Sequence, residues 1–278
     1  TATGGNWLGI SAIEVAGKRL VDNGVTPPNV PSIAATGASV GTKQGFSIIK
    51  FTNTTSDSTQ SHGLTQKPDF IIWKKTSGTS HWPVYHSSLG ATKYTYLNLT
   101  NAASTGSEFW NNTEPTSSIV TTKGEPNSMG SAGDTIMYLW HDVPGLQKFG
   151  KYTGNGNTTF GAFVQTDFKP ALLWVKRVAQ GTSYSSWSIY DSTRSTFNTI
   201  GTSAFNFPLW ANLTAQEGKR GNGSDAASGS ENIINFFSNG FMALGAGAEF
   251  NVSGETYIYC AWAEAPTFNL YGAQSNAR

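Results

Sequence analysis

Apolar residues along this chain come in short runs separated by glycine, asparagine, serine and proline, and long patterns with a helical period are nearly absent. Runs of this length and aromatic or β-branched content are typical of strands. The pattern therefore predicts an all-β protein. The predicted strands lie at 7–15, 45–51, 70–73, 119–122, 135–140, 172–175, 186–190, 233–237 and 256–262.

The N-terminal part of the chain carries a turn signal. Two stretches with alternating apolar positions, 10–15 and 18–21, flank the pair Ala16-Gly17. This arrangement predicts a β-hairpin. Three prolines between 27 and 31 then favour an extended segment. We predict an N-terminal hairpin unit over 1–25 and a proline-rich linker over 26–45.

The rest of the chain contains matching segments that recur in the same order. The matched segments are 50–53 with 151–155, 68–75 with 170–177, 82–87 with 187–192, 98–100 with 212–214, and 133–144 with 254–266. Their separation rises from 101 to 122 residues, because the second copy gains loop residues. An ordered series of this kind predicts an internal duplication, with one β repeat over 46–148 and another over 149–278.

Each repeat contains at least four predicted strands, which is enough for a sheet with one apolar face. Two such sheets can pack on each other, or each repeat can form a small sandwich of its own. We therefore predict a β-sandwich of jelly-roll or concanavalin-like type, in which the two repeats can share one domain.

The charge balance excludes several classes of partner. The 278 residues include 18 Lys and Arg against 17 Asp and Glu, and only 13% are charged. No basic run is present of the kind that binds nucleic acid or an anionic membrane surface, and the apolar runs are too short to span a bilayer. We predict no nucleic-acid partner and no membrane insertion. Many neutral polar residues with 9 Trp, 10 Tyr and 16 Phe are typical of extracellular lectins and virion fibres.

The residues with catalytic or metal-binding potential give no strong pattern. The single cysteine, Cys260, excludes an intramolecular disulfide, and its apolar surroundings indicate a core position. All histidines lie in the first repeat: His62, His81, His86 and His141. His81 and His86 are five residues apart on a strand-like segment, and this spacing places their side chains on opposite faces. A structural role is favoured over a metal site.

Glycoside hydrolysis needs two neighbouring carboxyl groups, and the acidic residues here are scattered. The acidic residues at equivalent places in the two repeats are Asp134 with Glu255, and Asp142 with Glu264. A residue present in both copies is more simply structural. Asp57 and Asp69 offer oxygen ligands for calcium, but without the spacing of a calcium loop. We predict that the protein is not an enzyme, with no catalytic, cofactor or metal residue, and the ligand-binding residues remain unknown.

Six segments form a motif series across most of the chain, and they lie at 45–49, 62–74, 82–86, 96–98, 144–156 and 238–241. The series resembles a repeated domain of unknown function that occurs toward the C-termini of long structural proteins of tailed phages, many of them marine. The ending 265–278 is similar to the usual terminus of those proteins. The stretch 10–22 is similar to the last strands of a laminin-G-like module that often precedes the domain.

The resemblance implies a virion component, and thus an extracellular particle: a tail fibre, or another surface fibre or adhesin that contacts the host cell. It implies other virion proteins as partners, a host surface glycan or protein as ligand, and no cofactor. Because fibres are commonly trimers, a homo-oligomer is expected, with a trimer favoured.

Two alternatives remain open. One is a polysaccharide-binding or depolymerising tail-spike module, in which loop aromatics stack on sugars. Exposure of Trp82, Trp110, Trp187 or Trp210 beside carboxylates would favour it, and burial of all four would favour the non-enzymatic fibre. The other is a secreted lectin-like domain of a cell.

Overall fold

The computed structural model describes residues 13–15, 18–20, 31–124, 132–179, 185–194, 198, 208–215, 217 and 233–264. Within these ranges the regular elements are strands, and every strand pair is antiparallel. This confirms the predicted all-β class. No helix in these ranges is long and apolar enough to cross a membrane.

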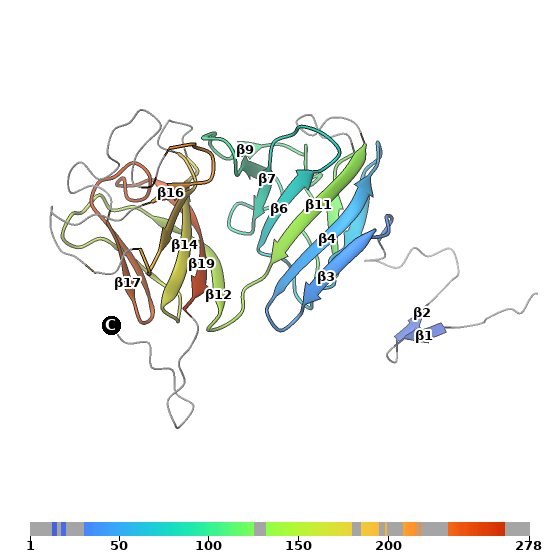
Figure 1. Ribbon diagram of the computed structural model, residues 1–278, viewed down its shortest axis with the longest axis horizontal. Coiled ribbons are helices and arrows are strands. Elements are labelled where there is room, and N and C mark those ends of the chain that lie inside the picture. Colours follow the sequence, from blue (N-terminus) through green and yellow to red (C-terminus); the bar gives the residue numbers. More distant parts are fainter. Residues whose placement is uncertain are drawn as a thin grey trace, which may run out of the picture.

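The N-terminal hairpin forms as the alternating pattern indicates. Strands β1 (Ile13–Val15) and β2 (Lys18–Leu20) pair with each other, with Ile13 opposite Leu20 (Figure 1). A different result holds inside the predicted linker 26–45, because β3 (Gly37–Gly41) pairs along β4 as an edge strand. The side chains of β3 are mostly exposed, so the sequence has no apolar pattern that would predict this strand. Backbone pairing with β4 holds it in the sheet.

The first half of the protein is a sandwich of a large and a small sheet. Its strands are β4 (Phe46–Asn53), β5 (Ser58–Ser61), β6 (Phe70–Lys75), β7 (Pro83–His86), β8 (Lys93–Tyr96), β9 (Ser104–Thr105), β10 (Ile119–Thr122) and β11 (Gly133–Trp140). The large sheet has the order β3-β4-β11-β6-β7-β8-β9, and β5 pairs with β10 in the small sheet. Trp73, Trp110 and Met137 lie in the core of this half.

The second half also consists of a large and a small sheet. Its strands are β12 (Gln147–Thr153), β13 (Ala162–Gln165), β14 (Pro170–Arg177), β15 (Ser188–Asp191), β16 (Leu209–Trp210), β17 (Ile233–Phe237), β18 (Gly240–Leu244) and β19 (Thr256–Ala263). The large sheet has the order β12-β19-β14-β15-β16, and the small sheet has the order β13-β18-β17. Phe168, Phe236 and Tyr257 lie in its core.

The two large sheets share a strand order, since β4-β11-β6-β7-β8 of the first half corresponds to β12-β19-β14-β15-β16 of the second. Equivalent lysines also make equivalent contacts. The Lys74 ammonium donates to the carbonyl of Ser80 at 2.8 Å, and the Lys176 ammonium donates to that of Ser185 at 2.5 Å. These observations support the predicted duplication, which stays a prediction.

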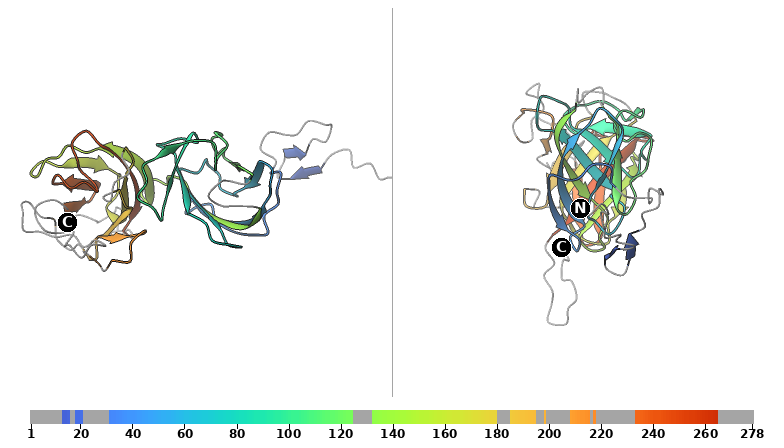
Figure 2. Two further views of the ribbon diagram at one scale, coloured as in Figure 1. Left: turned by 90° about the horizontal axis from the view of Figure 1, so that it is seen from above. Right: turned by 90° about the vertical axis from the view of Figure 1, so that its right-hand side faces the viewer.

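The large sheets also pack on each other, so several strands are buried on both faces. In β6, Ile71 and Trp73 face the first core, whereas Phe70 and Ile72 face the second half. Because successive side chains of a strand alternate between faces, a continuous apolar run is what such a strand requires. Both sandwich arrangements that the sequence allows therefore occur together, and the two halves lie side by side along the long axis (Figure 2).

Candidate functional site

The contact between the two large sheets, here called the joint, is mainly aromatic. Its buried members are Phe70, Ile72, Val84, Phe149, Val178, Trp187, Ile258 and Cys260. The ring centroid of Phe70 lies 5.6 Å from that of Phe149 and 6.0 Å from that of Trp187. Half-buried tryptophans, among them Trp174 and Trp262, pack around these rings. The joint is a third hydrophobic core.

Polar groups also cross the joint. The ring nitrogen Nε2 of His86 lies 3.1 Å from the carbonyl oxygen of Tyr259. The indole N–H of Trp187 donates to the carbonyl of Tyr96 at 3.0 Å. The ammonium of Lys176 donates to the carbonyl of Leu99 at 3.2 Å, and burial lowers the pKa of this lysine to about 7. These bonds satisfy polar groups that packing has removed from water.

Two of the four histidines, His62 and His86, hold local structure through both ring nitrogens. In His62 and His86, Nδ1 accepts the backbone N–H of the residue two positions later, at 3.1 and 3.2 Å. Each Nε2 therefore carries the proton and donates to a carbonyl, that of Thr116 or Tyr259. Burial lowers the pKa of both rings, to about 4 for His86. The neutral tautomer is thus built into the fold at both positions.

Two neighbouring carboxyl groups are those of Asp69, directly before β6, and Asp142, in the segment 141–146 that connects β11 to β12. Asp69 accepts the backbone N–H of Asp142 at 2.9 Å, and Asp142 accepts that of Phe149 at 2.8 Å. Burial, with a smaller contribution from the charge of Asp69, raises the pKa of Asp142 to about 6. Asp69 and Asp142 are 73 residues apart in the chain, so no local sequence pattern pairs them and only the fold brings them together.

The other acidic candidates lie apart and hold local structure. Asp134 accepts the hydroxyl of Thr52 at 2.7 Å, and Glu255 pairs with Arg177 at 2.9 Å. Glu264 pairs with Lys169. Asp57 accepts the N–H of Gly124, which together with Lys123 lowers the pKa of its carboxyl.

The remaining candidates for chemistry are also placed by the fold. Within the described ranges no group of three or more His, Cys, Asp or Glu side chains is arranged to hold a metal ion. Cys260 is buried in the joint, as its apolar surroundings indicate, and burial raises the pKa of its thiol.

The tryptophans named above as possible sugar platforms are mostly inside the protein. Trp110 and Trp187 are fully buried, and Trp210 is 6% exposed. Trp82 is half-buried against the joint, with the ammonium of Lys74 5.4 Å from its ring centroid. Core packing, rather than display to a ligand, accounts for their positions.

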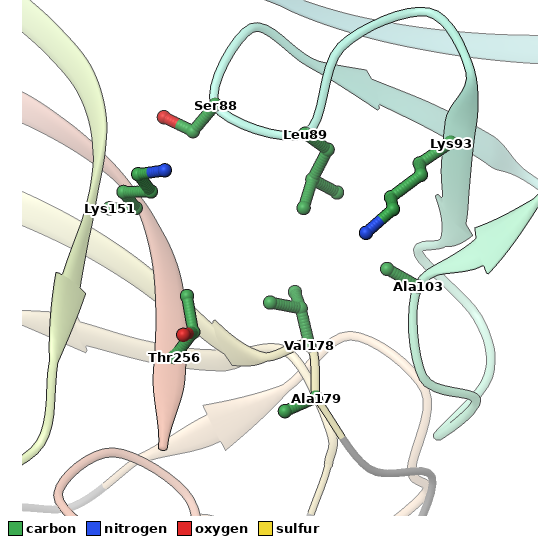
Figure 3. Close-up of a pocket in the computed structure, with 8 residues that line it drawn as sticks. All are labelled: Ser88, Leu89, Lys93, Ala103, Lys151, Val178, Ala179 and Thr256. Atoms are coloured by element: carbon green, nitrogen blue, oxygen red, sulfur yellow. The ribbon is translucent and has the colours of Figure 1, made fainter. Parts of the chain in front are cut away.

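A cleft of about 360 Å³ opens between the two halves at the edge of the joint. Its lining residues are Ser88, Leu89, Lys93 and Ala103 from the first half and Lys151, Val178, Ala179 and Thr256 from the second. Figure 3 shows Lys93 and Lys151 on opposite sides of the cleft, with Leu89 and Val178 between them. The volume lies in the range of small-ligand sites.

The cleft is positively charged. Among the described residues, Lys93 and Lys151 form no ion pair, and no acidic side chain lines the cleft. Ser88 and Thr256 add hydroxyl groups. No sequence pattern predicted this site, because β8 and β12 lie in different halves and only the joint brings them together. The one sequence feature that involved a residue of this cleft was the match of Lys151 with Lys50 in the series of matched segments.

The protein is thus an all-β protein of two joined sandwiches, whose large sheets share one strand order, and a cleft lies where the two halves meet. The family described as Domain of unknown function (DUF7483) matches residues 21–266, and the chain belongs to this family. No curated protein and no solved structure matches the chain.

Proposed function

We propose that the chain is part of a phage virion structural protein, a tail fibre or another surface fibre or adhesin, and that it contacts the host cell surface without cleaving it. The resemblance of its motif series to phage virion proteins supports this origin. The same resemblance supports a laminin-G-like module whose last strands include the hairpin of β1 and β2.

The observation that carries the non-enzymatic part of the proposal is how the chain uses its reactive side chains. His62, His86, Asp69 and Asp142 each bind backbone groups that hold turns or the connection between the halves. Trp110, Trp187 and Trp210 are buried, which favours a structural over a sugar-stacking role. The accessible cleft offers lysines and hydroxyls, which suit binding.

A depolymerising tail spike is the second candidate, and one observation favours it. Asp69 and Asp142 are neighbouring carboxyl groups, and the pKa of Asp142 is raised to about 6. A general acid beside an ionised carboxylate is the pair that glycoside hydrolysis uses. Against this candidate, both carboxyl groups already accept backbone N–H groups.

We expect the purified protein to be retained on susceptible cells in a panel of marine bacteria, and on glycans stripped from them, without release of reducing sugar. Retention and sugar release are measured on the same samples. Sugar release that disappears in Asp142→Asn would establish the second candidate instead. Absence of retention on every strain and glycan would contradict host contact and favour an internal virion part.

We further propose that the chain is a homo-oligomer, with a trimer favoured, and that it packs against other virion proteins. Phe160 is 77% exposed and Phe163 is 48% exposed, and apolar rings on the surface are suited to subunit contacts. We expect light scattering to give a trimer mass that falls to a monomer mass in Phe160→Ser/Phe163→Ser. A monomeric unmodified protein would contradict this proposal.

A further inference from the structure

We propose that the cleft between the halves binds an acidic saccharide unit, one that carries a carboxylate or sulfate group. This inference rests on the proposed contact with the host surface and adds the class of ligand. It begins with the charge: Lys93 and Lys151 face one cavity from opposite sides, and neither has an acidic partner among the described residues (Figure 3).

Lys93 and Lys151 are both exposed, so their ammonium groups can turn toward a ligand in the cleft. An anion placed between them would attract both positive charges. Each lysine is a compact charge on a flexible stem, so both can approach one anionic group. The two come from strands of different halves, β8 and β12, so that the site exists only when the joint is formed.

The rest of the lining suits a sugar ring. The hydroxyls of Ser88 and Thr256 can donate to or accept from sugar hydroxyls, and the aliphatic side chains of Leu89 and Val178 offer a surface for ring C–H groups. A few polar groups around an apolar surface are the usual composition of a small-molecule site. The volume of about 360 Å³ is suited to a ligand of monosaccharide size.

The chain supplies a matched control. Lys50 lies at the position on β4 that matches Lys151 on β12 in the sequence series, and it is exposed and not among the residues that line the cleft. Lys50→Gln therefore removes the same charge from an equivalent strand. Ala179→Trp provides a second test of the cleft. It fills the exposed rim of the cleft with a large side chain and leaves the charge unchanged, so it should block binding by size alone.

The experiment measures binding of the full chain to immobilised polygalacturonate, dextran sulfate and neutral dextran in 150 mM NaCl, which screens long-range attraction. We expect binding to at least one of the two acidic polymers and none to dextran. Lys93→Gln/Lys151→Gln is expected to weaken the Kd at least tenfold, which corresponds to about 1.4 kcal/mol. Ala179→Trp is expected to weaken it as well, and Lys50→Gln to leave it within twofold.

Equal binding by the double variant, equal binding to dextran, or no binding to either acidic polymer would overturn the inference. The cell assay separates this result from the proposed function. If the double variant is retained on host cells as well as the unmodified protein, the cleft is not the contact and host attachment stands. If the protein binds acidic polymers through the cleft but no cells, the cleft site stands and host attachment fails.

Discussion

Replacing Phe70 with alanine is expected to lower the free energy of unfolding by about 3–5 kcal/mol, the usual cost of removing a buried phenylalanine side chain. Phe70 is fully buried in the joint. Its ring contacts those of Trp140, Phe149, Trp174 and Trp187, so truncation leaves a cavity lined by large rings from both halves. These rings cannot collapse into the space without moving their own strands.

Guanidinium chloride unfolding followed by tryptophan fluorescence measures this loss, because Trp174 and Trp187 belong to the joint. Val40→Ala is the control, since Val40 is 41% exposed and its truncation should change stability by no more than about 0.5 kcal/mol. Equal effects of the two substitutions would show that the joint contributes little. A single transition that becomes two in Phe70→Ala would show that the joint couples the halves.

Acidification from pH 7 to pH 4 is expected to remove about 3 kcal/mol of stability through His86 alone. Burial lowers the pKa of His86 from its usual 6.5 to about 4. Between these values the unfolded chain binds a proton that the native ring does not. The free energy of unfolding therefore falls as the pH falls through this window.

The hydrogen bonds of His86 explain why the native ring resists protonation. Nδ1 accepts the backbone N–H of Ser88, so a proton added to Nδ1 would point at another hydrogen-bond donor and break this bond. Nε2 already donates to the carbonyl of Tyr259 in the other half. Protonation would thus break a turn of the first half and place a charge inside the joint.

Chemical denaturation at several pH values, in the unmodified protein and in His86→Gln, tests this prediction. The variant keeps a donor for Tyr259, and it should be less stable at pH 7.5 but lose less stability down to pH 4. Parallel pH curves for the unmodified protein and His86→Gln would contradict the assignment.

Two further groups with shifted pKa values, His62 and Asp142, change the stability in opposite directions as the pH falls. The pKa of His62 is also lowered by burial, so His86→Gln retains part of the acid sensitivity. The pKa of Asp142 is raised from 3.8 to about 6, so the native state binds the extra proton there, and stability from this group falls as the pH rises through that window. The comparison with His86→Gln isolates the histidine because Asp142 is present in both proteins.

Much of the local structure could be predicted from the sequence. The hairpin of β1 and β2, the strands β6 and β19 and the core position of Cys260 follow from short-range apolar patterns and turn residues, because a strand shows its buried faces directly in the order of its side chains. The strand β3 was missed inside the predicted linker, since it is held by backbone pairing and carries no apolar alternation. The connection between the halves lies at 141–146, slightly before the predicted repeat boundary at 148 and 149.

Patterns among neighbouring residues are enough to predict the all-β class, the positions of the main strands and the ordered series of matched segments. Three features arise only when the chain folds: the packing of the large sheets on each other, the contact of Asp69 with Asp142, and the placement of Lys93 and Lys151 at one cleft. The apolar or charged character of a side chain predicts whether it is buried or exposed, but not which distant residue it will contact. Contacts between residues far apart in the chain depend on how whole sheets pack together.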